Sequence, residues 1–113
     1  MTENDVKKYL LMSYDQDLVY TLHLYLSNDY YYYSSHLMPC VGFARRKIAK
    51  GIFNPYLFIQ AVKLGIDGML RDSSFRKVYF DLPSKIGLPE RYQVAKHLAN
   101  YILVDFLDMK EIK

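Results

Sequence analysis

Apolar residues recur at helical spacing after Asn54. They are Phe58, Ala61, Val62, Ile66 and Met69. This period places them on one face of an α-helix. Asn54 can accept hydrogen bonds from the first free N–H groups, and Pro55 lacks the N–H that a helix leaves unused at its first residue. The pattern predicts a core-facing helix from Pro55 to Arg71. Gly65 and Gly68 lie on it, where they can let another element approach closely.

The cleanest helical stripe lies near the end of the chain. It consists of Val94, Leu98, Ile102 and Phe106. Pro89 suits the first turn of a helix, and the negative charge of Glu90 suits the positive end of the helix dipole. The pattern predicts a helix of about 18–20 residues in which all residues of the stripe are buried.

A third helix is predicted between Pro39 and Gly51. Its apolar residues are Val41, Ala44 and Ile48, and its basic residues are Arg45, Arg46, Lys47 and Lys50. Lys47 and Lys50 fall in the last turn, near the negative end of the helix dipole. Gly51 can then adopt the left-handed conformation that commonly ends a helix.

The sequence pattern does not decide between helix and strand for two segments, residues 17–27 and residues 75–80. In residues 17–27 the leucines alternate as in a strand, but Leu18, Leu22 and Leu26 also fit a helical stripe. We favour a helix, because no hairpin turn or clear partner strand lies nearby. Residues 75–80 make the best strand candidate. One strand cannot form a sheet, so both segments are strands or neither is.

These patterns predict a mainly α protein. Residues 1–113 would form a single compact domain of four or five helices, packed as an irregular or orthogonal bundle. No linker rich in Gly, Ser or Pro divides the chain. Apolar residues make up 51% of the sequence, which is a globular composition and sufficient for one core.

Four consecutive tyrosines follow an Asn-Asp pair. Asn28 is a good N-cap, and a helix that begins there would carry Tyr30 and Tyr33 on its core face. Tyr31 and Tyr32 would then point toward solvent, another element or a partner. The run can be a packed helix start, or a binding surface, since exposed tyrosines are enriched at interfaces. Disorder is the third interpretation, and the aromatic content argues against it.

The net charge of +3 is distributed unevenly along the chain. Residues 1–29 sum to −3, residues 30–66 contain no acidic residue and sum to +5, and residues 67–113 sum to +1. Such asymmetry can create a local positive field. The basic helix and the tyrosines upstream of it mix cations with aromatic rings, as nucleic-acid grooves do. The alternative interpretation is a solvated helix face.

The sequence argues against several kinds of chemistry. A single cysteine, Cys40, excludes a disulfide within the chain and a cysteine-rich zinc site. His23, His36 and His97 lie far apart and form no local ligand motif, so we expect no metal site. The glycines are scattered and form no phosphate-binding loop, and we expect no cofactor. Because no catalytic constellation is visible, we predict that the protein is not an enzyme.

Hydropathy gives an expectation for the compartment. No apolar run approaches the roughly 18 residues that cross a bilayer, and the apolar run near the N-terminus is too short for a signal peptide. We therefore expect a soluble, cytoplasmic protein with no membrane partner.

Several short motifs follow one another along residues 20–107. They are an Asn-Asp pair with a later tyrosine, a proline before a basic helix, a Lys-Gly-x-Phe-Asn turn and an Arg-x-x-x-Ala helix. The residues are Asn28, Asp29, Tyr33, Pro39, Lys50, Gly51, Phe53, Asn54, Arg91 and Ala95. Together they resemble a family of small uncharacterised proteins from bacteriophages and mobile elements. The segment from Gly68 to Phe75 departs from the family pattern. The resemblance implies a helical fold and a phage-like origin, and it implies no activity.

We therefore predict a non-catalytic, phage-type accessory protein that binds another macromolecule. The favoured partner is a host protein, such as a host factor or a defence component. The predicted partner-binding residues are Tyr31, Tyr32, Arg45, Arg46, Lys47 and Lys50. One alternative is a nucleic-acid-binding module that uses residues 40–50. Another is a structural or virion-associated protein that forms a homodimer or larger homo-oligomer.

Overall fold

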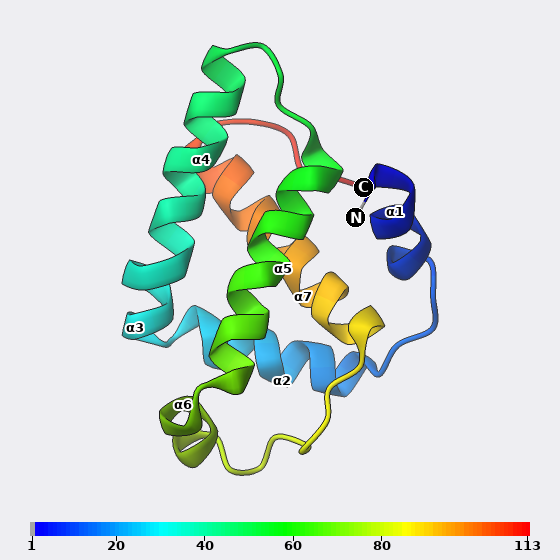
Figure 1. The fold of residues 1–113 in the computed structure, drawn as a ribbon, viewed down its shortest axis with the longest axis vertical. Coiled ribbons are helices and arrows are strands. Elements are labelled where there is room, and N and C mark those ends of the chain that lie inside the picture. The colour runs from blue at the N-terminus through cyan, green and yellow to red at the C-terminus, as the bar shows by residue number, and fades with distance from the viewer. Residues whose placement is uncertain (1) are drawn as a thin grey trace.

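The computed structural model describes residues 2–113, which form helices joined by short loops and contain no strand (Figure 1). In chain order the elements are α1 (Glu3–Leu10), α2 (Gln16–Ser27), α3 (Tyr30–Tyr32), the π-helical η1 (Tyr33–Leu37), α4 (Met38–Ala49), α5 (Pro55–Arg71), α6 (Ser73–Val78), α7 (Leu88–Tyr101) and the π-helical η2 (Ile102–Phe106). The predicted mainly α fold is confirmed. The described residues form six continuous helical segments, more than the four or five expected, because α1 and α6 were not predicted.

The predicted ends of α4 and α5 are confirmed. The Asn54 side chain accepts hydrogen bonds from the N–H groups of Tyr56 and Leu57 at 2.9 and 3.1 Å, and α5 ends at Arg71. Gly51 has a φ of 71°, the left-handed conformation that only glycine adopts at little cost. Ile52 N–H then donates to the Lys47 carbonyl at 3.0 Å, which is the usual closing bond of a glycine-terminated helix.

Pro39 was expected to mark the start of a helix, and that boundary is wrong. Tyr30 to Ala49 form one continuous helix, α3–η1–α4, which passes through Pro39. Proline removes an N–H, and its ring clashes with the carbonyl four residues earlier in an α-helix. Here the turn before the proline is π-helical, and Met38 N–H donates to the carbonyl of Tyr33, five residues back. The wider turn gives the proline ring room.

The two ambiguous segments are both helical. Residues 17–27 lie in α2, so the favoured interpretation is confirmed. The strand candidate at 75–80 is wrong, because α6 covers residues 75–78 and a turn follows. The Asp72 carboxylate accepts hydrogen bonds from Ser74 and Phe75 N–H groups and so starts α6. The unpredicted α1 begins with a capping box between Thr2 and Asp5.

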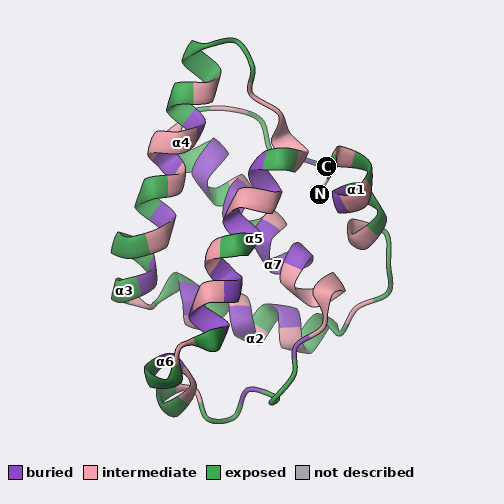
Figure 2. Cartoon of the chain, viewed as in Figure 1, coloured by how far each residue is buried: buried purple, intermediate pink, exposed green. Residues whose placement is uncertain are grey.

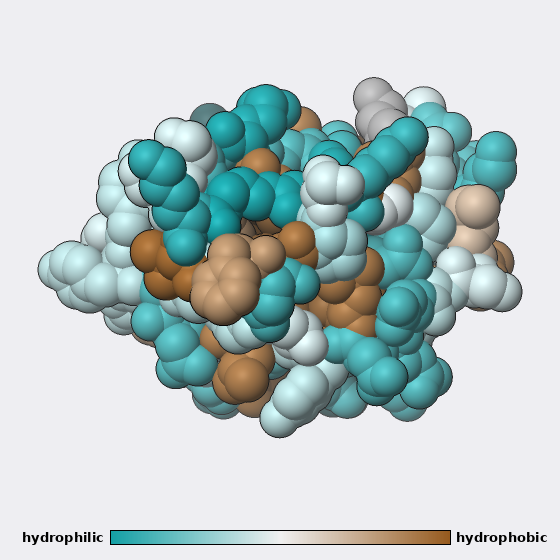
Figure 3. Space-filling view, turned by 90° about the horizontal axis from the view of Figure 1, so that it is seen from below, coloured by the Kyte–Doolittle hydropathy of each residue, from teal (hydrophilic) through white to brown (hydrophobic). Residues whose placement is uncertain are grey.

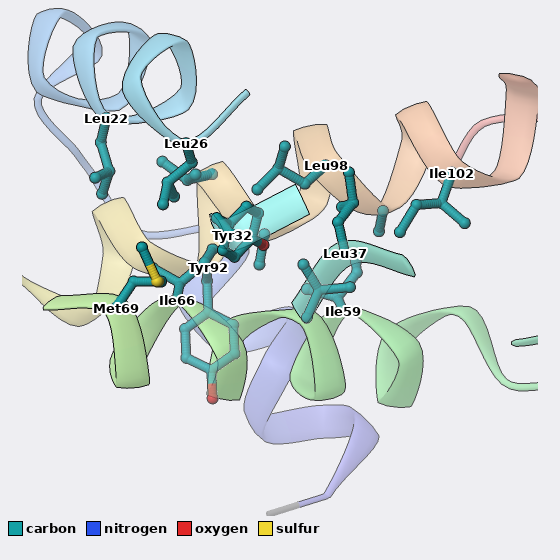
Figure 4. Packing of buried hydrophobic residues seen from close by; sticks show 14 of the residues in the cluster. Leu22, Leu26, Tyr32, Leu37, Ile59, Ile66, Met69, Tyr92, Leu98 and Ile102 are labelled. Carbon is teal, nitrogen blue, oxygen red and sulfur yellow. The ribbon is translucent and has the colours of Figure 1, made fainter. Parts of the chain in front are cut away.

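The core lies between α5, α7, α2 and the helix α3–η1–α4, whose inward faces are the buried ones in Figure 2. Figure 4 shows side chains from these helices packed into one cluster.

The predicted stripe on α7 is only partly buried. Val94, Leu98 and Ile102 are buried as predicted, but Phe106 is only half-buried. The π-helical η2 interrupts the regular α-helical period between Ile102 and Phe106, so the stripe does not continue into the core at Phe106. Ile48 of the predicted basic-helix stripe is also exposed.

A group of charged side chains joins α5 to α7 beside this core. Asp67 and Lys63 lie one turn apart on α5, and Asp67 Oδ2 is 2.8 Å from Lys63 Nζ. The other carboxylate oxygen is 3.0 Å from Arg91 Nη1 on α7. Arg91 Nε also donates to the carbonyl of Ile86 at 2.9 Å, which fixes the loop before α7. Lys63 and Asp67 are both buried, and among the ion pairs of the described residues Lys63 depends on Asp67 for its charge partner.

Candidate functional site

The tyrosine run is exposed in a different order from the one predicted. Tyr32 is buried with 1% of its surface exposed, whereas Tyr30 is 81% exposed, Tyr31 56% and Tyr33 36%. The expectation that Tyr30 and Tyr33 face the core and Tyr32 faces outward is therefore wrong, and only Tyr31 lies as expected. Figure 4 shows Tyr32 within the central cluster with Leu26, Leu37 and Leu98. Burial raises the pKa of the Tyr32 hydroxyl.

The π-helical turn η1 explains this order. Leu37 and Val41 are buried one α-helical turn apart, and continuing that spacing backward would bury Tyr33. Because η1 contains an extra residue per turn, the next buried position lies five residues before Leu37, at Tyr32. The helix also starts one residue later than predicted. Asp29 is its N-cap and accepts a hydrogen bond from Tyr32 N–H at 2.9 Å.

Two of the three exposed tyrosines of the run, Tyr31 and Tyr33, border separate hollows. Tyr31 lies beside a hollow of about 340 Å³ between the start of α3 and α6, and Tyr33 lies beside another between α2 and α7. The first hollow is lined by Asp29, Tyr31, Met69, Asp72, Ser74, Phe75 and Val78. Figure 3 looks onto this end of the molecule and shows hydrophobic side chains gathered among hydrophilic ones. Val78 and Phe80 are among the exposed apolar residues, at 67% and 86%.

The second surface is a groove between α2 and α7, built around a pair of histidines. The ring centroids of His23 on α2 and His97 on α7 lie 5.6 Å apart. His23 lines two hollows of about 410 and 330 Å³, which therefore adjoin. The lining residues of the two hollows are Tyr14, Gln16, Val19, Tyr20, His23, Ser27, Tyr33, Leu37, His97, Leu98 and Tyr101. We call this surface the tyrosine–histidine groove.

The tyrosine–histidine groove has no formal charge along its lining. None of its lining residues is Asp, Glu, Lys or Arg. Burial lowers the pKa of His23, and the neighbouring His97 lowers it further. Burial also lowers the pKa of His97, with a smaller contribution from Lys96. Both imidazoles are therefore neutral at pH 7, and each can donate and accept one hydrogen bond.

The predicted basic residues lie far from the tyrosines. Arg45, Arg46 and Lys50 are exposed, and Lys47 is half-buried with its Nζ 5.4 Å from the centre of the Phe43 ring. Tyr31 and Arg45 stand on one continuous helix, so about 21 Å of helix separates them. The two groups occupy opposite ends of α3–η1–α4 (Figure 1). The predicted mixture of cations and tyrosine rings on one surface is therefore not formed.

The chemistry of the remaining reactive groups is limited. Burial raises the pKa of the Cys40 thiol to about 11, so the thiolate is scarce at neutral pH. Across residues 2–113 no three histidine, cysteine or acidic side chains converge as metal ligands would. In the same part of the chain no helix has the length and apolarity to cross a membrane.

Comparison with known proteins gives no relative: no family model, curated protein or solved structure matches this chain. The resemblance to small bacteriophage proteins therefore stays a prediction.

The sequence did not point to His23, His97 or to the tyrosines outside the run. These residues come from α2, α7 and the loop between α1 and α2, and only the packing of α2 against α7 brings them together. The available signal was composition: 12 of the 113 residues are tyrosine, more than one helix start accounts for.

Proposed function

We propose that the protein is a non-catalytic binding protein whose partner is another protein, engaged at the tyrosine–histidine groove. The observation that carries the proposal is the convergence of four tyrosines, from four different segments, around the histidine pair. These tyrosines are Tyr14, Tyr20, Tyr33 and Tyr101. Tyrosine supplies a large rigid ring and a hydroxyl at low entropic cost, and it is enriched among the residues that dominate binding energy at interfaces.

The electrostatics of the groove favour a protein over a nucleic acid. A phosphate backbone needs cations, and the groove lining contains none. Neutral rings and hydroxyls instead suit apolar and polar side chains of a protein, where desolvation costs least. Tyr31 and the separate hollow beside it form a second contact area at the start of α3. The carboxylates of Asp29 and Asp72 lie at the edge of that hollow.

The arrangement of the groove also supports a non-catalytic role. Nucleophilic catalysis needs a nucleophile hydrogen-bonded to its base. Among residues 2–113 neither His23 nor His97 is hydrogen-bonded to a serine, cysteine or carboxylate. A phage-type origin and a bacterial host protein as partner follow from the motif resemblance alone, and they form part of this proposal.

The test compares two pairs of exposed aromatic residues. The groove variant Tyr20→Ala/Tyr101→Ala removes two rings that are 68% and 43% exposed, so folding should be unaffected. The matched control Tyr30→Ala/Phe80→Ala also removes two exposed rings, at 81% and 86%, outside the groove. Each protein is immobilised and incubated with nuclease-treated bacterial lysate, and the bound proteins are quantified by mass spectrometry.

The expected result is a protein that is retained by the wild type and the control but lost by the groove variant. The purified partner should then bind the wild type directly, with an affinity reduced by at least about fivefold for each groove tyrosine removed. Equal loss with both variants, or no protein lost selectively, would refute the groove as the site. Mass measurement in solution tests the remaining alternative, because a dimer that the groove variant dissociates would make a second copy of this chain the partner.

A further inference from the structure

The end of α4 and the start of α5 form a corner that projects from the core. We call residues 45–57 the α4–α5 corner. None of these residues is buried, although Ala44 before them and Phe58 after them are both core residues. Figure 2 shows this corner as a mostly exposed segment at one end of the molecule. Its exposed side chains are therefore free to meet a partner without any rearrangement of the core.

The corner carries four cations that the protein does not neutralise. They are Arg45, Arg46, Lys47 and Lys50, and none of them takes part in an ion pair with the described residues. No acidic residue occurs between positions 30 and 66. Glu3 approaches the base of the corner, but its carboxylate is already bound to Lys7 at 3.3 Å and to the Asn54 amide at 3.3 Å.

The cations are held on regular helix and not on a loose loop. All but Lys50 belong to α4, and the left-handed Gly51 fixes the point at which the helix ends. From Arg45 to Lys50 the helix rises about 7.5 Å. Over the same length of axis, duplex DNA carries about four phosphate charges on its two strands. The partial negative charge at the helix C-terminus, about half an electron, is outweighed by four full positive charges.

We propose that the α4–α5 corner binds the phosphate backbone of duplex nucleic acid without sequence preference. A single strand is a poorer fit, because such sites need exposed aromatic rings on which bases stack. The exposed apolar side chains of the corner are aliphatic, namely Ile48, Ile52 and Leu57, and the Phe43 ring nearby is covered by Lys47. Adenine reading by an amide side chain is also disfavoured, because the only amide of the corner, Asn54, is used as a helix cap.

The nucleic-acid site is independent of the proposed protein-binding groove. No residue of the corner lines the groove, and Tyr33, the groove tyrosine on the same helix, lies about 18 Å along the helix from Arg45, so the two partners can be bound together. The protein would then act as an adaptor that holds a protein on nucleic acid.

An anionic membrane is the competing occupant of the corner, but its three exposed aliphatic side chains bury little apolar area compared with a membrane-anchoring helix.

The test is the salt dependence of binding to a fluorescently labelled duplex of about two helical turns and arbitrary sequence. If the corner contacts four phosphates, a plot of the logarithm of the association constant against the logarithm of the salt concentration should have a slope near −3.6. Between about 50 and 200 mM salt the affinity should then fall roughly 150-fold. The variant Arg45→Ala/Arg46→Ala should flatten the slope by about two units. Both arginines are exposed, so an unchanged melting temperature should show that the variant is folded.

The matched control is Lys77→Ala/Lys85→Ala, which removes the same charge from two exposed residues outside the corner. It should leave the slope within half a unit of the wild type. No binding of the wild type at low salt would overturn the proposal, and so would equal effects of the two variants. Tighter binding to a single strand of the same length, or binding to phosphatidylserine vesicles without binding to the duplex, would assign the corner to a different partner and also overturn it.

Discussion

Arg91 on α7 binds the carboxylate of Asp67 on α5, with 3.0 Å between Arg91 Nη1 and Asp67 Oδ1. The same carboxylate neutralises Lys63, whose Nζ also lies 5.3 Å from the centre of the Tyr92 ring. Asp67 thus serves two cations at the packed face between α5 and α7. The arrangement fixes how these two helices sit against each other, and α7 in turn positions His97 in the tyrosine–histidine groove.

Replacing Asp67 should therefore be costly. In Asp67→Asn the buried Lys63 loses its charge partner, and a buried cation without a partner typically destabilises a protein by about 3–5 kcal/mol. The free energy of unfolding in urea measures this loss. The control is Glu3→Gln, which removes the charge of an exposed pair with Lys7 and should cost less than about 1 kcal/mol. Similar losses in both variants would show that the buried pair contributes no more than a surface pair.

Helix content, the end of α4 and the start of α5 were readable from the sequence because they depend on local chemistry. Asn54 followed by Pro55 starts α5, and Gly51 ends α4, as the capping rules require. The glycines on α5 also behave as expected: a Cβ at Gly65 would lie 3.4 Å from His36 Cβ, so His36 is the close neighbour that they admit.

The orientation of two helices was not readable, and both errors have one cause. A regular helical period assigns Tyr33 and Phe106 to the core, whereas the π-helical turn η1 moves the buried position to Tyr32 and η2 interrupts the period before Phe106, which is only half-buried. A π-helical turn adds one residue without a distinctive local sequence. The tyrosine–histidine groove was hidden for a different reason, since it requires the tertiary packing of α2 against α7.

The orientation of the tyrosine run can be tested by stability. Tyr32→Ala removes a fully buried aromatic side chain and should cost about 3–5 kcal/mol. Tyr30→Ala removes a side chain that is 81% exposed and should change stability by less than about 0.5 kcal/mol. Chemical denaturation of the two variants measures both values. If Tyr30→Ala were the more destabilising change, the helix would be turned as a regular α-helical period predicts.

Because His36 packs against the α5 glycines, substitutions at Gly68 and Gly65 should change the stability of the protein in opposite directions. A Cβ at Gly68 would meet only His36 Cε1, at 3.9 Å, so Gly68→Ala should stabilise the protein by up to about 1 kcal/mol through helix propensity. Gly65→Val should destabilise it by about 1–3 kcal/mol, because its branched side chain extends beyond the 3.4 Å available to a Cβ and displaces His36. Thermal melting measures both changes. Equal stabilisation by both substitutions would mean that His36 moves away at no cost.

The histidine pair should make stability fall in mild acid. Burial lowers the pKa of both His23 and His97 in the folded protein, whereas in the unfolded chain each takes up a proton below about pH 6.5. The unfolded state therefore binds more protons in this window, and the free energy of unfolding should decrease as the pH falls through 6.5. The contribution is fully present above that pH and is lost as the pH approaches the lowered pKa of the folded state.

The variant His23→Gln/His97→Gln isolates this effect from that of the carboxylates. Carboxylate titration is common to both proteins, so the difference in their pH dependence reports the two imidazoles. The wild type should lose more stability than the variant between about pH 7 and pH 5, as measured by urea denaturation at each pH. The same loss in both proteins would show that the imidazoles are protonated as easily in the folded groove as in the unfolded chain. A larger loss in the variant would mean that the groove stabilises the charged imidazole, opposite to the effect of burial.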